Sequence, residues 1–193
     1  MLSVPVFVVC AGCDIPSGQG PLRGLPAGTS LGVTQRNAGQ FPTWHYGTWT
    51  ACLDGDHPVT IDTVDAQLVG GVRLTAVGAK RATDGGVAGW PGPLPARYAP
   101  AAGFTVTERC DKREEVEIVL ELAVPDSGSS GVNGFTVRYH VGDRQYALDY
   151  PVAIVLCQGH DVRADPQFLD DCADRGAPAG PTRWTSEPMG TTG

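Results

Sequence analysis

The chain has 193 residues, a formal net charge of −7 at neutral pH, 26 Gly, 16 Pro and six Cys. The acidic balance and the absence of any basic run exclude an ordinary nucleic-acid-binding protein. No stretch of apolar residues is long enough for a transmembrane helix, and a hydrophobic fraction of 41% is too high for a wholly disordered chain. The Gly and Pro content disfavours long helices, so the composition indicates a globular protein with little helix.

The first thirteen residues have the pattern of an export signal. An apolar run over residues 4–9 is followed by Cys10-Ala11-Gly12-Cys13, and small residues before a cysteine fit the groove of a signal peptidase. This tetrapeptide resembles a bacterial lipobox, with Cys10 where Leu is usual, and the resemblance implies cleavage before Cys13 and diacylation of its sulfur. We expect residues 1–12 to be a signal-like segment and Cys13 to anchor an extracytoplasmic protein to the cell membrane, with secretion as the alternative localisation. In the competing interpretation, residues 4–9 form a short buried strand.

The segment that follows Cys13 has no hydrophobic periodicity. Residues 14–40 are rich in Gly, Pro, Ser, Gln and Thr, a composition typical of linkers. The sequence therefore predicts a flexible tether over residues 13–40, between a lipid anchor and a folded domain.

Four cysteines remain if Cys10 is removed and Cys13 is lipidated: Cys52, Cys110, Cys157 and Cys172. An even number in an exported protein predicts two disulfides, for which three connectivities are possible. We favour Cys110–Cys157, since both residues follow predicted strands, and Cys52–Cys172 then remains. The alternative is a set of four reduced, buried thiols in a cytosolic protein.

Apolar and polar residues alternate over several short segments, which is the pattern of half-buried strands. The clearest segment is 115–124, where the apolar residues from Val116 to Val124 share one face and Glu115, Glu117 and Glu121 share the other. Gly142-Asp143 predicts a two-residue hairpin turn, and Pro151 predicts an edge position or a bulge. The predicted strands cover residues 58–64, 72–77, 104–108, 115–124, 135–141, 146–150 and 152–157.

Several short strands with turn signals between them predict an all-β fold, an antiparallel immunoglobulin-like β-sandwich over residues 41–174. A short helix over 166–174 closes this domain, because Asp165 suits the N-cap and Pro166 the first helical position. Residues 175–193 are expected to form a disordered tail. The whole chain is similar to small exported proteins of high-GC Gram-positive bacteria that carry one β domain behind a signal or lipobox, a resemblance that implies no activity.

Aromatic residues offer the main candidate for a binding surface. Trp44, Tyr46, Trp49 and Trp90, with Tyr98 as a further contributor, could form a carbohydrate-type platform for a ligand; in the alternative interpretation they cap the ends of the sandwich. The Glu115, Glu117 and Glu121 stripe is expected on a solvent face, where it lacks the cleft and raised pKa that a glycosidase pair needs.

The sequence offers two metal sites as alternatives. Cys157-Gln158-Gly159-His160 resembles the ligand loop of blue-copper proteins, with His45, His57 or His140 as the upstream ligand, but no Met follows at the required place. Asp residues around 54–57 and 161–174 could bind calcium, although neither stretch has the spacing of a calcium loop.

We therefore expect an exported, lipid-anchored β-sandwich that acts as a non-catalytic binding or envelope-associated module. Its expected partners are the membrane, through the lipid, and a protein or another component of the cell envelope, but not nucleic acid. No cofactor, metal or catalytic residue is expected. The alternative is a loop-built copper or calcium protein, or an enzyme whose site the sequence does not reveal.

Overall fold

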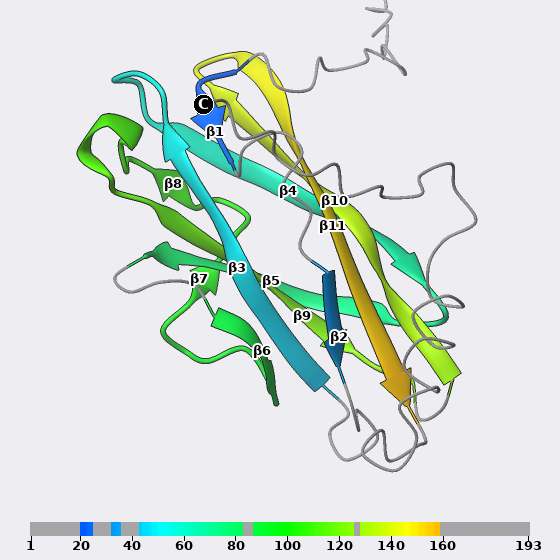
Figure 1. The fold of residues 1–193 in the computed structure, drawn as a ribbon. Coiled ribbons are helices and arrows are strands. Elements are labelled where there is room, and N and C mark those ends of the chain that lie inside the picture. Colours follow the sequence, from blue (N-terminus) through cyan, green and yellow to red (C-terminus); the bar gives the residue numbers. More distant parts are fainter. Residues whose placement is uncertain (1–19, 25–31, 36–42, 83–86, 126–127, 159–193) are drawn as a thin grey trace, which may run out of the picture.

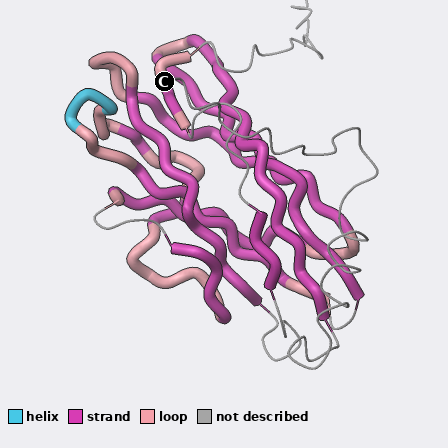
Figure 2. Tube along the Cα trace, viewed as in Figure 1, coloured by secondary structure: helices cyan, strands magenta, loops and turns pink. Residues whose placement is uncertain are grey.

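The computed structural model describes residues 20–24, 32–35, 43–82, 87–125 and 128–158, and these residues form β-strands joined by turns (Figures 1 and 2). The strands are β1 (Leu22–Arg23), β2 (Gly32–Gln35), β3 (Thr43–Leu53), β4 (Val59–Val69), β5 (Arg73–Arg81), β6 (Val87–Pro91), β7 (Ala99–Pro100), β8 (Thr105–Val106), β9 (Val116–Ala123), β10 (Gly128–Val141) and β11 (Arg144–Gln158). One 3-10 turn, Cys110–Lys112, precedes β9.

The strands form two sheets. The first has the order β1-β3-β9-β5-β7, with β6 also paired to β3, and the second has the order β2-β11-β10-β4-β8. Every pairing is antiparallel except that of β2 with β11. An all-β fold of two sheets, as the sequence predicted, is therefore present.

The two sheets pack against each other through a shared apolar core. Alternate residues of β9 contribute to it, and Val116, Ile118, Leu120 and Leu122 have no exposed surface, as their period of two predicts. Across the core, the ring of Trp49 meets that of Phe135 edge to face, with 5.0 Å between centroids. We call the face of each sheet that points away from this core its outer face.

Turn chemistry accounts for the longest hairpin. β10 and β11 are paired from Val141–Arg144 onward, with Gly142 at the turn in a positive-φ conformation (φ 55°) that a two-residue hairpin turn requires. Further along, β11 has Pro151 and Val152 between its pairs to Asn133 and Phe135, where β10 has one residue. The bulge predicted at Pro151 is confirmed, because proline has no N–H to donate to the ladder.

Some segments expected to be loops are strands. β10 begins at Gly128, within a Gly- and Ser-rich stretch whose composition hides its period, and β6 and β7 lie in the Pro-rich stretch 82–103. β1 and β2 lie within residues 13–40, the predicted tether. The signal-like segment 1–12, the predicted helix 166–174 and the tail 175–193 lie outside the described residues.

Candidate functional site

The four aromatic residues predicted to form a platform do not share a surface. Trp44, Tyr46 and Trp49 are buried in the core between the sheets, while Trp90 is 43% exposed. Trp44 and Tyr46 face the core together as residues i and i+2 of β3, and a bulge between Gly47 and Trp49 keeps Trp49 on the same side. The four-residue platform is therefore wrong, and Trp90 is the part of it that reaches solvent.

Trp90 lies at the edge of the first sheet, on its outer face. It is paired with His45 of β3, and His45 is paired on its other side with Glu121 of β9. Side chains directly opposite in antiparallel strands share a face, and the Trp90 and His45 rings stack with 6.0 Å between centroids. The exposed indole of Trp90 thus stacks on the buried ring of His45, and Trp90, His45 and Glu121 form a row across three strands.

Residues 92–98, which we call the covering segment, lie against this outer face. The Leu94 N–H donates to Glu121 Oε2 at 2.6 Å, and Thr75 Oγ1 donates to Glu121 Oε1 at 2.6 Å. His45 Nδ1 lies 3.2 Å from the Gly92 carbonyl oxygen. Glu121 therefore has both carboxylate oxygens engaged, and its role here is to hold the covering segment next to Trp90.

Glu117 is buried under the same segment, contrary to the solvent-facing stripe predicted for Glu115, Glu117 and Glu121. It is 2% exposed, and its Oε2 accepts from Lys80 Nζ at 3.1 Å and from the Tyr98 hydroxyl at 3.1 Å. Burial, and then the negative charge of Glu117, raise the pKa of Tyr98 above its ordinary value. Glu115, by contrast, is exposed as expected. The predicted alternation of inward and outward residues is confirmed. The solvent exposure predicted for the outer face at Glu117 is wrong, because the covering segment packs on it.

The cysteines pair differently from the favoured arrangement. Cys52 is bonded to Cys110, so the Cys110–Cys157 and Cys52–Cys172 pairings are wrong. The reason is tertiary: the Leu53 N–H donates to the Glu108 carbonyl at 2.8 Å, and an isolated bridge joins Leu53 to Arg109. This brings the chain before β9 beside the end of β3.

Cys13 and Cys172 lie outside the described residues, as does the side chain of Cys157 on β11. The histidines of the copper alternative lie apart: His45 is on the outer face of the first sheet, His57 is in the turn between β3 and β4, and His140 pairs with Asp62 on the second sheet. Within the described ranges, no group of three or more His, Cys, Asp or Glu could hold a metal ion.

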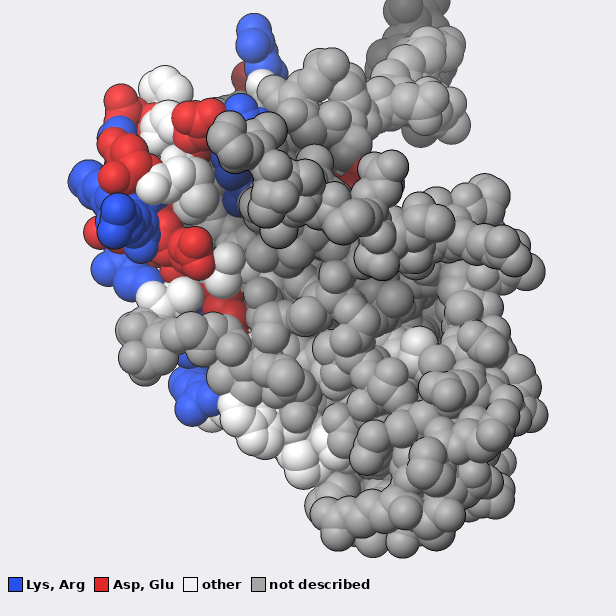
Figure 3. Space-filling model, viewed as in Figure 1, with Lys and Arg blue, Asp and Glu red and all other residues white. Residues whose placement is uncertain are grey.

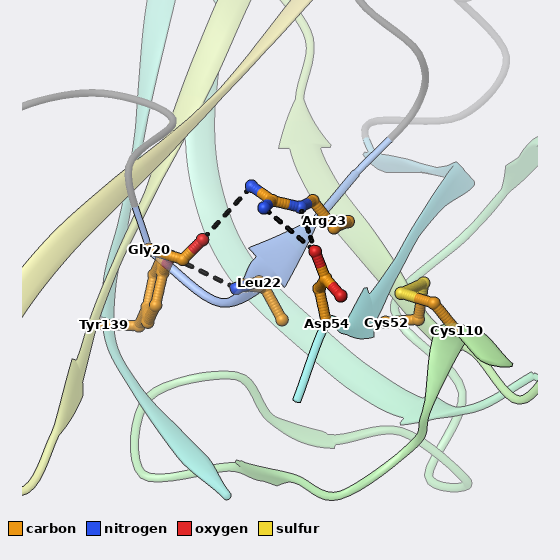
Figure 4. A network of polar contacts seen from close by, with 7 residues as sticks. All are labelled: Gly20, Leu22, Arg23, Cys52, Asp54, Cys110 and Tyr139. Atoms are coloured by element: carbon orange, nitrogen blue, oxygen red, sulfur yellow. Dashed lines mark hydrogen bonds and ion pairs between the residues drawn. A yellow bond between two sulfur atoms is a disulfide. The ribbon is translucent and has the colours of Figure 1, made fainter. Parts of the chain in front are cut away.

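The acidic stretch after β3 is engaged by arginines, as Figure 4 shows for Asp54. Arg23 donates through Nε and Nη2 to Asp54 Oδ2, at 3.2 and 3.0 Å, and through Nη1 to the Gly20 carbonyl oxygen at 3.2 Å. Arg109 pairs with Asp56 and with Asp111. These carboxylates therefore serve as ion-pair partners at this end of the sandwich.

Sequence reasoning missed the residues that meet at this end of the molecule. Leu22 is 1% exposed, and its N–H donates to the Tyr139 hydroxyl at 3.3 Å (Figure 4). The Asp54 N–H donates to the Pro21 carbonyl at 2.7 Å. The sequence signal is faint, a single Leu between Pro21 and Arg23 in a Gly-rich stretch. Its burial depends on distant partners, Leu53 on β3 and Tyr139 on β10.

Comparison with known proteins adds no relationship. No protein-family model matches the chain, and no curated protein matches it.

No helix among the described residues has the length and apolar character needed to cross a bilayer.

Proposed function

We propose that this chain is an exported, lipid-anchored β-sandwich of immunoglobulin-like type that acts as a non-catalytic binding module at the cell envelope. The immunoglobulin-like assignment is supported by two antiparallel sheets over one core supplied by alternating residues. The binding role is supported by the outer face of the first sheet, where the described structure offers an exposed aromatic ring on a rigid base.

Export is supported by two independent features. The Cys52–Cys110 disulfide is of a kind that persists outside the reducing cytosol. The Cys10-Ala11-Gly12-Cys13 segment supplies the lipidation signal. A domain of this size with many Gly and Pro also gains stability from such a cross-link.

Trp90 is the observation that carries the binding role. It is one of two large apolar side chains exposed among the described residues, the other being Leu68 on β4 at 40% exposure. Trp90 differs from Leu68 in that its ring is stacked on the buried His45 and flanked by the covering segment, so it is held in place before a partner arrives. Large, pre-positioned aromatic residues are the usual anchors of protein interfaces.

The anchoring is tested by mass spectrometry of the full chain isolated from membranes under non-reducing conditions. A chain that starts at Cys13 with a diacylglyceryl group supports the proposal, and Cys13→Ser should move the protein out of the membrane fraction. Recovery of the intact Met1 on a membrane-free protein overturns it.

The binding surface is tested by incubating the full chain with isolated cell envelopes and measuring the bound fraction. Trp90→Ala should weaken binding by at least about ten-fold, as expected when a central anchor is truncated. Leu68→Ala is the matched control, because it removes a similarly exposed apolar side chain from the other sheet, and it should bind like the parent. Equal binding by the parent and both variants overturns the assignment of Trp90 as the anchor.

A further inference from the structure

The residues that enter the sandwich first are part of its folded body. At Gly20 an added Cβ would lie 2.0 Å from the Tyr139 hydroxyl, and at Gly24 it would lie 2.9 Å from the Tyr150 ring. Between these two close approaches, the buried Leu22 is held by the bonds to Tyr139 and to the turn after β3. Residues 20–24, the N-terminal clasp, are thus fixed across both sheets.

The clasp shortens the connection to the lipidation site. Only residues 14–19 separate Cys13 from Gly20, so the connection spans at most about 25 Å even when fully extended. A tether that ran on to residue 40 would span about 95 Å. Because the clasp belongs to the folded body, the linker between the lipid and the body is short instead of long.

We propose that the end of the sandwich that carries the clasp is its membrane-facing surface, a proposal that rests on the lipidation of Cys13. This end comprises β1, the turn 54–58 between β3 and β4, and the tip of the β10–β11 hairpin at Gly142 (Figure 1). The partner is the lipid surface into which the acyl chains insert.

The length of the body excludes the inverted arrangement. β3 and β4 have 11 residues each, and strands of that length extend for about 35 Å. With the opposite end on the lipid, Gly20 would stand about 35 Å from the surface, beyond the reach of a 25 Å connection. With the clasp end on the lipid, Trp90 stands away from the membrane, because its partner His45 lies eight residues along β3 from Leu53, or about 26 Å.

Electrostatic attraction to the lipid headgroups does not orient this end. Where Figure 3 shows described charges at this end, basic and acidic side chains lie next to one another. Several of them form ion pairs, as in Arg23–Asp54 and in Arg109 with Asp56 and Asp111. Paired charges of both signs offer little to an anionic headgroup. The orientation therefore comes from the short connection and is independent of lipid charge and of salt.

The test places a fluorophore at either end of the lipidated full chain, in vesicles of neutral phosphatidylcholine that carry a nitroxide quencher on the headgroup. An azide-bearing amino acid takes the place of His57, in the turn beside the clasp, or of Arg73, at the opposite end; both side chains are exposed, and this chemistry leaves the cysteines untouched. Quenching at position 57 should exceed that at position 73 several-fold, with no change when anionic lipid or salt is added.

A second variant lengthens the linker between Cys13 and the clasp and keeps the lipid anchor. Twenty Gly and Ser residues inserted after residue 16 should reduce the difference in quenching between the two positions, while the same insertion after residue 176 should leave it unchanged. Equal quenching at both ends, or stronger quenching at position 73, on a protein whose diacylglyceryl mass is confirmed overturns the orientation and leaves the anchoring intact. Absence of that mass overturns both proposals.

Discussion

The outer faces of the two sheets look alike in sequence and differ in structure. Both are lined by polar residues that alternate with apolar ones, yet Glu117 on the first sheet is buried beneath the covering segment, whereas Arg138 and Asp65 on the second pair in the open, 46% and 62% exposed. The first face is also cross-linked at one end by Cys52–Cys110. The contrast shows that polar alternation marks which residues point away from the core, but not whether solvent reaches them.

The largest effect is expected from removing the disulfide that fixes the covered face. Cys52 and Cys110 close a loop with a sequence separation of 58, and a loop of that length corresponds to a loss of about 4 kcal/mol in the free energy of unfolding. Urea denaturation of Cys52→Ala/Cys110→Ala under non-reducing conditions measures this loss. A midpoint equal to that of the parent would show that the cross-link does not restrict the unfolded chain.

The second-largest loss of stability is expected from breaking the buried ion pair between Glu117 and Lys80 on the first sheet. Glu117→Gln leaves Lys80 beside a neutral group, and breaking a buried pair costs about 3 kcal/mol at the lower end of its usual range; the lower end applies because the Lys80 side chain is 21% exposed. Chemical denaturation of the variant measures the change. The double variant Glu117→Leu/Lys80→Met is the control, since removing both charges should restore much of the stability, and a double variant no more stable than Glu117→Gln would contradict the ion-pair explanation.

Acidification should weaken the part of the first sheet next to the Cys52–Cys110 disulfide through Glu108. Burial by itself favours the neutral carboxyl, but the bonds donated by the Thr107 N–H at 2.9 Å and Arg81 Nε at 2.8 Å outweigh it, so the pKa of Glu108 lies below its ordinary value. Because the folded-state pKa is lowered, the stabilisation is present above the ordinary pKa of 4.5 and is lost as the pH falls through the folded-state value.

Glu108→Gln tests this assignment. The free energy of unfolding of the variant should be about 1.5 kcal/mol lower at neutral pH, the lower end of the range for hydrogen bonds to a charged group. Its stability should also depend less on pH below 4.5 than that of the parent. Unfolding measured between neutral pH and pH 3 gives both quantities. Parallel profiles of stability against pH for the two proteins would rule out Glu108 as the source of the acid-dependent loss of stability.

The smallest effect is expected on the open face. Asp65→Asn removes the exposed pair with Arg138 Nε, at 2.9 Å, and pairs of this kind contribute about 0.5 kcal/mol or less because water and salt screen them. Thermal unfolding of this variant beside Glu117→Gln compares the two faces directly. Losses of similar size in the two variants would remove the distinction between a covered and an open face.

The strands with strict alternation could be predicted, and the short or irregular ones could not. β9 and the β10–β11 hairpin were visible because period-two burial and the Gly142-Asp143 turn are local signals. β1, β6 and β7 were not predicted because they are brief and lie among Gly and Pro residues, and they pair only where a longer strand offers an edge. Propensity carries little information for segments of this kind.

The candidate surface was predicted in part. Trp90 was among the aromatic residues predicted to form the platform, but the residues predicted to join it, Trp44, Tyr46 and Trp49, are core residues. Its neighbours in space, His45 and Glu121, come from other strands, and their positions follow from the pairing register of β6, β3 and β9. Register across non-consecutive strands depends on the whole sheet, so no local pattern could have shown it.

The sequence by itself determined the all-β class, the inward and outward alternation of the long strands and the main hairpin, because each depends on neighbouring residues. Only the tertiary structure decided that Cys52 meets Cys110, that Glu117 is buried and that residues 20–24 join the folded body. These contacts bring together groups between 19 and 117 positions apart. Their energy comes from burial and pairing in a place that exists only after the two sheets have closed on each other.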